Sequence, residues 1–513
     1  MYLFVHEHQV RDAAGLGNAV PRTAVNGHEP EQYPPFQVIP IKRIIPLPGV
    51  DPFTLFCALK ITKGYILESM EGVPRRAVRS IIGMEPEFEI VLGESPAISG
   101  TYPGGSLFPP LLGDDPVSQL RSLSSRFPYT PGGEGDFDGG FVGYCSYDMV
   151  TSLSGGHVQA GRDDIPLARF MCSTRGIVYN HVQGSCLLFE DIFLSHGYEG
   201  DEAICLAQQR LDALEKRIQD IPVPAGSGHS STVMGTLTDP GQEDRERYQE
   251  MVRKAKEHIM AGDIFQVVLA RKISVPFHGD PLAIYRRIRS INPSPYLYYL
   301  NFGDEAIVGS SPEMLVKVQR GVVQTVPIAG TRTRGKDPAE DSRLSEELLS
   351  DEKERAEHLM LVDLARNDIG RVSTFGSVSV PEFMEIEKFS HVQHIVSRVC
   401  GTVAEGKDRF DALASCFPAG TVSGAPKIRA MQIIADLEPS PRGLYAGAVG
   451  YCGFDDLLEF AIAIRTVRVK GGLAEFSTGA GIVADSVPER EFEETVQKAR
   501  AMVSAVGASE GGP

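Results

Sequence analysis

The pattern of apolar positions divides the chain into two stretches of different character. Between residues 38 and 221, short apolar runs alternate with clusters of glycine and proline, as at 141–144, 176–179 and 186–193. Runs of this length bounded by turn residues predict strands joined in hairpins. The stretch ends in a segment, 202–218, whose apolar residues recur every three or four positions, and this spacing predicts an amphipathic helix.

The second stretch combines strand patterns with longer helical ones. We expect helices at 245–261, 338–367 and 488–506. Between and around them, apolar runs predict strands at 264–273, 296–302, 306–309, 322–327, 446–454, 459–469 and 473–478. Strand runs bracketed by helix runs indicate the α+β fold class.

A segment rich in proline, glycine, serine and threonine, residues 222–243, lies between the two stretches and is typical of a linker. We therefore expect an N-terminal half over 36–221 and a second domain over 244–506. Residues 1–35 have the glycine and proline content of a loose extension, and residues 507–513 form a polar tail.

Composition narrows the class of protein. The 513 residues include 50 Lys+Arg and 67 Asp+Glu, a net charge of −17, which argues against nucleic acid or an anionic membrane as the main partner. The hydrophobic fraction of 42% and charged fraction of 23% exclude wholesale disorder. The cysteines are far apart and form no C-x-x-C motif. With no long apolar run and no signal peptide, we expect a cytoplasmic protein without a transmembrane helix.

Two of the expected helices each carry glutamates three positions apart, Glu354 with Glu357 and Glu491 with Glu494. The first pair shares a stripe with leucines, so its carboxylates lie beside residues that favour burial. Buried carboxylates need a cation, and oxygen ligands without cysteine favour Mg²⁺. The same spacing also fits two solvated amphipathic helices, and spacing alone leaves both interpretations open.

Two histidines, His391 and His394, stand three positions apart and could share a metal. They lack a third ligand at recognisable spacing, and the apolar residues of 389–399 also fit packed or surface histidines. No cysteine lies in a Gly-x-Cys-x-Gly motif. A covalent cysteine mechanism is therefore not indicated.

Several motifs in register resemble the chorismate-utilising enzyme family. They are Pro327–Arg332, Asp351–His358 with Val362–Asp368, Pro418–Lys427, Gly479–Ser486 and Glu491–Lys498. The resemblance spans residues 245–503 and implies two antiparallel β-sheets forming a sandwich flanked by helices. Within the family, the chain is most similar to large subunits that convert chorismate and ammonia to anthranilate and pyruvate in tryptophan biosynthesis.

The resemblance assigns residues to the two carboxylates of the substrate. In the family Mg²⁺ holds the ring carboxylate, and the matching ligands are Glu357 and Glu494, with Glu354 and Glu491 beside them. Two cations match the residues that bind the enolpyruvyl carboxylate, a task that suits the planar fork of an arginine. The positions matched to the substrate are Arg465 and Lys498 together with Gly330, Thr331, Tyr445, Gly479 and Gly481.

The resemblance also assigns the chemistry. Glu313 matches the general acid that protonates the C4 hydroxyl as ammonia adds at C2, and His394 matches the proton carrier for pyruvate elimination. Gln266 stands where water-activating relatives carry a lysine, and because glutamine cannot act as a base, an amine nucleophile is favoured. Ala329 replaces the lysine typical of aminodeoxychorismate synthases, which favours anthranilate as the product.

The N-terminal half resembles the family more weakly and is expected to be regulatory. Residues 66–69 and 292–297 resemble the feedback site for tryptophan, in which Glu68 would meet the ligand's ammonium. The full set expected at this site is Glu68, Ser69, Pro295, Tyr296 and Leu297. Residues 66–69 also fit a plain strand end, and residues 1–35 do not match the family's usual start.

A separate glutamine amidotransferase subunit is the expected source of ammonia, because that activity needs an activated cysteine whose motif is missing here. The expected assembly is therefore a hetero-oligomer. Two alternatives remain: an aminodeoxychorismate synthase component of the folate pathway, and a non-catalytic ligand-sensing subunit. The second would be expected to lack Glu313, His394 or a metal carboxylate, and the sequence keeps them all.

Overall fold

The computed structural model describes residues 35–46, 50–70, 79–103, 110–129, 137–161, 163–194, 200–222, 241–389 and 392–507. Almost all of the expected extension, most of the expected linker and all but the first residue of the expected tail lie outside the described residues. Among the described residues, no helix is both long and apolar enough to cross a bilayer.

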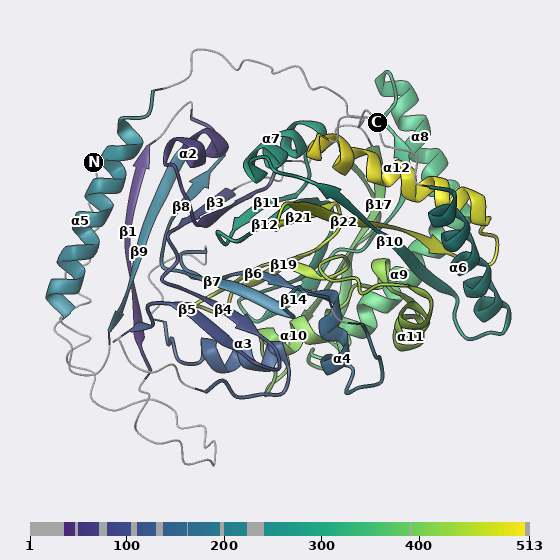
Figure 1. Cartoon of the computed structure of the whole chain (residues 1–513), viewed down its shortest axis with the longest axis horizontal. Helices are drawn as coiled ribbons and strands as arrows, with labels where there is room; N and C mark the ends of the chain where they lie inside the picture. Colours follow the sequence, from purple (N-terminus) through teal and green to yellow (C-terminus); the bar gives the residue numbers. More distant parts are fainter. Residues whose placement is uncertain are drawn as a thin grey trace.

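Two large sheets, whose strands pair antiparallel throughout, form the centre of the molecule (Figure 1). The first sheet has the order β1-β9-β8-β3-β2-β11-β12-β21-β22-β10-β18. Its strands are β1 (Gln37–Pro46), β2 (Gly64–Glu68), β3 (Arg79–Met84), β8 (Arg175–Asn180), β9 (Ser185–Leu194), β10 (Gln266–Pro276), β11 (Tyr296–Asn301), β12 (Glu305–Ser311), β18 (Gly424–Ala425), β21 (Thr466–Lys470) and β22 (Leu473–Ile482).

The second sheet has the order β15-β17-β14-β13-β20-β19-β6-β7-β4-β5, and β16 pairs with β17 off this path. Its strands are β4 (Phe88–Leu92), β5 (Ala97–Gly100), β6 (Gly140–Cys145), β7 (Ala168–Ser173), β13 (Met314–Gln319), β14 (Val322–Thr325), β15 (Ile328–Thr333), β16 (Ser379–Lys388), β17 (Val392–Thr402), β19 (Ala448–Gly453) and β20 (Leu458–Ile462).

Strands from both stretches of the sequence are neighbours in both sheets. In the first sheet β2 pairs with β11, and in the second β6 pairs with β19. The two stretches therefore build one shared sandwich, and the α+β class with two antiparallel sheets is confirmed.

The alternation of side chains along the strands produces three hydrophobic layers. The inner layer lies between the sheets and includes Tyr144 and Met171 of the second sheet and Tyr298 and Ile307 of the first. The two outer layers pack under helices. In Figure 1, α5 covers β1 and β9 at one end of the molecule, while α12 and α6 lie over β22 and β10 at the other.

Several helices begin at an Asp-Pro pair. The aspartate caps the free N–H groups of the first turn, and proline suits the first helical position because its missing N–H is not needed there. This pair starts α2, α3, α7 and α8. The helices are α2 (Pro52–Ala58), α3 (Pro116–Ser124), α4 (Val150–Leu153), α5 (Gly200–Gln219), α6 (Gln242–Met260), α7 (Pro281–Ile291), α8 (Pro338–Ser350), α9 (Glu352–Gly370), α10 (Arg409–Cys416), α11 (Lys427–Leu437) and α12 (Pro488–Val506), with the 3₁₀ turns η2 (Tyr147–Met149) and η3 (Gly420–Val422).

The expected helix over 338–367 is instead two helices, α8 and α9. Asp351 separates them with an extended backbone, and its carboxylate accepts the N–H groups of Lys353 and Glu354. An N-capping side chain competes with continuation of the preceding helix, which is why the chain breaks there. The break makes Glu354 part of the first turn of α9.

The expected strand over 459–469 is also two strands. β20 belongs to the second sheet and β21 to the first, and the chain passes between them at Arg465. Arg465 has a φ of 51°, a left-handed conformation that is unusual for a residue with a Cβ. This position brings a predicted substrate-binding cation to the junction of the two sheets.

Candidate active site

His394 is on β17, and the neighbouring strand β15 holds its side chain in place. It pairs with Thr331 across β17 and β15, and its Nδ1 lies 2.8 Å from the carbonyl oxygen of Gly330 and 3.1 Å from Thr331 Oγ1. A carbonyl can only accept, so this contact assigns the proton of the neutral ring to Nδ1 and leaves Nε2 as an acceptor. Burial lowers the pKa of His394, and the charge of Arg465 lowers it further. The ring is therefore a neutral base at physiological pH.

Two cations approach this region from different elements. Arg465 lies at the junction of β20 and β21, close enough to His394 to influence its pKa. Lys498 is on α12, where Nζ donates to the carbonyl of Gly479 at 3.1 Å and lies 2.7 Å from Glu494 Oε1. The side chain of Lys498 is 53% exposed. The cation can therefore exchange its carboxylate partner without a large desolvation cost.

Glycines let side chains approach the backbone of β22 and β15. A Cβ on Gly479 would lie 2.6 Å from the Tyr445 hydroxyl, and one on Gly481 would lie 2.7 Å from Gln266 Nε2. Gly330 has a φ of 65°, and its Cβ would lie 3.1 Å from Glu354 Oε2. Any larger residue at these positions would displace a neighbour or strain the backbone.

Gln266 is the first residue of β10 and is buried. Its Nε2 donates to Glu357 Oε1 across 3.4 Å, while its Oε1 is buried without a hydrogen-bond partner in the described part of the chain. An uncharged amide in this position can orient a ligand but cannot take a proton from water.

Glu313 lies in a small cavity of about 30 Å³ that it shares with Pro327, Leu361, Asp368 and Thr421 among others. Burial raises the pKa of Glu313 to about 8, although the Thr421 hydroxyl and the Ile328 N–H oppose the effect. The carboxyl group is therefore largely protonated at neutral pH. The cavity of Glu313 is also lined by Pro327, and the Ile328 N–H that contacts Glu313 lies at the start of the strand that carries Gly330.

The sequence matches a known protein family over most of its length. Residues 85–504 match the model of the chorismate binding enzyme family. The chain belongs to this family.

Relatives in this family are similar over most of the chain. Anthranilate synthase component 1 of Methanothermobacter thermautotrophicus is 43% identical over 459 residues, covering 89% of this chain and 92% of the relative. The protein of the same name from Streptomyces coelicolor is 45% identical over 406 residues, covering 78% of each chain.

Solved structures of chorismate-binding enzymes share the fold. Anthranilate synthase component I from Streptococcus pneumoniae is 37% identical, with a TM-score of 0.71, covering 83% of this chain and 92% of that one. The menaquinone-specific isochorismate synthase of Escherichia coli is 20% identical, with a TM-score of 0.68, covering 93% of this chain and 96% of that one. The second likeness concerns the fold alone.

The carboxylates expected to hold Mg²⁺ in this chorismate-binding enzyme come near one another without forming a closed cluster. Burial raises the pKa of Glu357, and the nearby charges of Glu354 and Glu494 raise it further; burial and Glu494 also raise the pKa of Glu491. Glutamates on α9 and α12 thus repel one another. Among the described residues, no three His, Cys, Asp or Glu side chains converge as a preformed metal cluster. Lys498 lies 2.7 Å from Glu494 and Arg332 lies 3.3 Å from Glu354, so part of this negative charge is already balanced. The oxygen donors of the four carboxylates fit a hard divalent cation.

The residues expected at the feedback site lie together in part. Glu68 stands opposite Leu297 across β2 and β11, so both side chains project from the helix-covered face of the first sheet. Tyr296 projects from the opposite face, where its hydroxyl donates to Glu459. Glu68 already accepts the Tyr285 hydroxyl at 2.6 Å.

The partner of Glu68 is a cation that sequence reasoning missed. Arg289 Nε donates to Glu68 Oε2 at 2.8 Å, and its Nη2 donates to Oε1 at 3.1 Å. A ligand ammonium at Glu68 would have to share the carboxylate with Arg289. The signal that could have indicated this contact is the basic last turn of α7, which precedes 292–297 directly.

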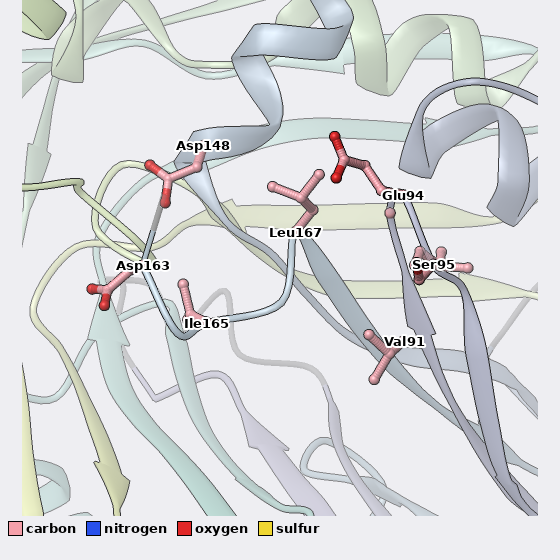
Figure 2. A pocket seen from close by; sticks show the side chains of 9 residues that line it. Val91, Glu94, Ser95, Asp148, Asp163, Ile165 and Leu167 are labelled. Carbon is pink, nitrogen blue, oxygen red and sulfur yellow. The ribbon is translucent and has the colours of Figure 1, made fainter. Parts of the chain in front are cut away.

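A larger cavity, of about 220 Å³, lies away from all the predicted site residues (Figure 2). Figure 2 shows Asp148 and Asp163 on one side of it and Glu94, Ser95 and Val91 on the other. Burial raises the pKa of Asp148 to about 7. None of the chemistry assigned above uses this cavity.

Proposed function

We propose that this chain is the chorismate-aminating component of an anthranilate synthase, converting chorismate and ammonia to anthranilate and pyruvate. The observation that carries the choice of nucleophile is the buried Gln266 beside Glu357. Water is a weak nucleophile that needs a base to remove its proton, whereas neutral ammonia is nucleophilic enough to attack without losing a proton first. The similarity of 39% to 45% to proteins named anthranilate synthase component 1 supports the same product.

Departure of the C4 hydroxyl requires an acid, since hydroxide is a poor leaving group. Glu313 is suited to this task because burial keeps it protonated at neutral pH. After the transfer, the buried carboxylate regains a proton readily because burial raises its pKa. The Ile328 N–H and the nearby Thr421 hydroxyl lower the pKa of Glu313 and so favour its ionised form during this step.

Elimination of pyruvate and aromatisation of the ring require a proton to move. His394 is neutral, and the Gly330 carbonyl fixes its Nδ1–H. Its Nε2 can therefore take the ring proton and return it to the departing enolpyruvyl group, which becomes pyruvate. Thr331 and Gly330 hold the imidazole plane in place for both transfers.

The substrate is a dianion in a protein of net charge −17, so local positive charge must bind it. Arg465 and Lys498 would bind the enolpyruvyl carboxylate. Glu357 and Glu494, with Glu354 and Glu491 nearby, would hold Mg²⁺, which when bound supplies positive charge for the ring carboxylate. A subunit without catalytic function is disfavoured because Glu313 and His394 both keep environments suited to proton transfer.

The direct test is incubation of the purified chain with chorismate, an ammonium salt and Mg²⁺, following anthranilate fluorescence and pyruvate release. Aminodeoxychorismate synthase is the alternative with the same substrates, and it would form a product that retains the enolpyruvyl group. Ala329 in β15 favours anthranilate. Formation of aminodeoxychorismate without pyruvate would overturn the proposal.

Replacing His394 with alanine is expected to slow pyruvate release more than ammonia addition, because the base that moves the ring proton is lost. The loss should be about 10²–10⁴-fold, the usual contribution of a general base. The measurement is single-turnover analysis in which the aminated intermediate and pyruvate are quantified together. An equal loss in both steps would contradict the role assigned to His394.

A separate amidotransferase subunit is the proposed ammonia source, and tryptophan is the proposed inhibitor.

Replacing Ser69 with alanine should weaken tryptophan inhibition by about tenfold, the effect of losing one good hydrogen bond to a charged ligand. The kcat should stay near that of the unmodified enzyme, because Ser69 directly follows β2 of the first sheet, whereas His394 is on β17 of the second. Inhibition titrations at fixed chorismate measure both quantities, and unchanged inhibition would count against the site.

A further inference from the structure

A chain of hydrogen bonds connects the 292–297 segment to Arg465. Ser310, on β12, is fully buried, and its Oγ lies 2.5 Å from the carbonyl oxygen of Asn292 and 2.8 Å from Ser294 Oγ. The same Oγ accepts Asn292 Nδ2–H at 3.1 Å. Three polar groups that would be costly to bury alone are thus satisfied by one another.

Both the side chain and the backbone of Arg465 contact this cluster. Arg465 Nη1 donates to Asn292 Oδ1 across 3.4 Å, and the Ser310 N–H donates to the Arg465 carbonyl at 3.1 Å. Arg465 has a φ of 51°, a conformation that persists only where surrounding contacts impose it. Asn292 and Ser310 supply contacts of this kind on one side of the residue.

The other end of this series of hydrogen bonds lies next to β2. The Ser294 carbonyl accepts the N–H of Met70 at 3.2 Å, directly beyond Glu68 and Ser69. Hydrogen bonds therefore run without a gap from the surface expected to bind tryptophan, through Ser294, Ser310 and Asn292, to Arg465. Arg465 in turn lowers the pKa of His394.

We infer that Asn292 and Ser310 are positioning residues for Arg465. Through the same hydrogen bonds, a ligand bound at the Glu68–Leu297 surface changes the affinity of the protein for its anionic substrate. The inference rests on the proposed function. An arginine binds a carboxylate through two parallel N–H groups only in one orientation, so a small rotation of the guanidinium weakens binding. A ligand that shifts Ser294 against Met70 changes that orientation through the shared hydroxyl of Ser310. Linkage makes the effect reciprocal, so chorismate weakens tryptophan binding by the same factor.

The test measures KM for chorismate, kcat and tryptophan inhibition in Asn292→Ala and Ser310→Ala. Each should raise KM by about tenfold, the effect of losing a hydrogen bond to a charged group, and change kcat by less than about twofold. Asn292→Asp should raise KM further, because a carboxylate beside Arg465 competes with that of the substrate. In Ser310→Ala, tryptophan should also change KM by a smaller factor than in the unmodified enzyme.

Ser80→Ala is the matched control, since Ser80 is a fully buried serine of the same sheet whose hydroxyl contacts His181. It should leave KM unchanged. A general loss of structure would lower kcat and thermal stability together, and if Asn292→Ala fails to fold, Ser310→Ala and Asn292→Asp carry the test. Unchanged KM in the folded variants, or a fall in kcat with KM constant, would overturn the positioning role.

The proposed function and this inference fail in different ways. Calorimetric titration with chorismate measures binding without turnover. An unmodified chain that binds chorismate but forms no anthranilate would refute the proposed function, while weaker binding by Ser310→Ala would still support the positioning of Arg465. An unmodified enzyme that tryptophan does not inhibit would overturn the coupling.

Discussion

Replacing Glu313 with glutamine is expected to lower kcat by about 10²–10⁴-fold, the contribution of a general acid, with little change in chorismate binding. Glutamine keeps the shape of the side chain, but it has no acidic proton to give to the departing hydroxyl. The measurement is steady-state anthranilate formation with ammonium as the nitrogen source, together with a chorismate binding titration.

The pH dependence gives a second measure of the same role. The pKa of Glu313 is raised to about 8, and the acid works only while protonated, so kcat should hold below that pH and fall as pH rises through it. The descending limb should disappear in the residual activity of Glu313→Gln. Glu382→Gln, the same change in a surface ion pair with Arg398, serves as control. Full activity in Glu313→Gln would remove Glu313 from the mechanism.

Much of the fold could be predicted from periodicity alone because many elements have one clear apolar face. The helices 202–218 and 488–506 correspond to α5 and α12 within two residues at each end. The errors fall where a single residue overrides the pattern. Asp351 ends α8 by capping α9, and Arg465 turns the chain between sheets although the flanking residues read as one strand. The β16 strand was missed because its side chains alternate between exposed and half-buried positions, without a strongly apolar face.

The residues matched to the site by resemblance lie near one another in linked groups: His394 with Gly330, Thr331 and Arg465, and Gln266 with Glu357 and Gly481. The residues that hold them were less accessible to sequence reasoning. Asn292 falls within the 292–297 motif, yet the contacts of Asn292 and Ser310 with Arg465 depend on the end of α7, β12 and the β20–β21 junction meeting across sequence separations of more than 150 residues. Polar partners of this kind follow from tertiary register, which no local pattern encodes.

The ion pair between Glu68 and Arg289 is a second contact that the sequence pattern could not predict. The position of Glu68 on β2 opposite Leu297 follows from the strand pattern, but its ion pair with Arg289 depends on how α7 packs on the first sheet. A carboxylate that looks available in the sequence is therefore already paired with a cation in the fold. Any ligand at this surface competes with, or joins, an existing pair.

Replacing Glu357 with alanine is expected to reduce turnover to below about 1% at millimolar Mg²⁺, because changes even to outer neighbours of a metal cost about 10–100-fold in metal affinity. Glu357 is the carboxylate whose pKa reflects both Glu354 on its own helix and Glu494 on α12. Removing it relieves the repulsion between these groups, so the protein should fold at least as well. The measurement is the anthranilate rate over a range of Mg²⁺ concentrations.

Glu352→Ala is the matched control, since Glu352 lies in the first turn of the same helix but is exposed. It removes the same charge from α9 and should leave the Mg²⁺ dependence unchanged, which separates a specific ligand from a general loss of negative potential. Metal titration followed by calorimetry should show weaker Mg²⁺ binding in Glu357→Ala independently of activity. Near-normal rates at low Mg²⁺ in that variant would mean that the carboxylates of α9 and α12 meet for another reason, and the anionic substrate would then depend on Arg465 and Lys498 alone.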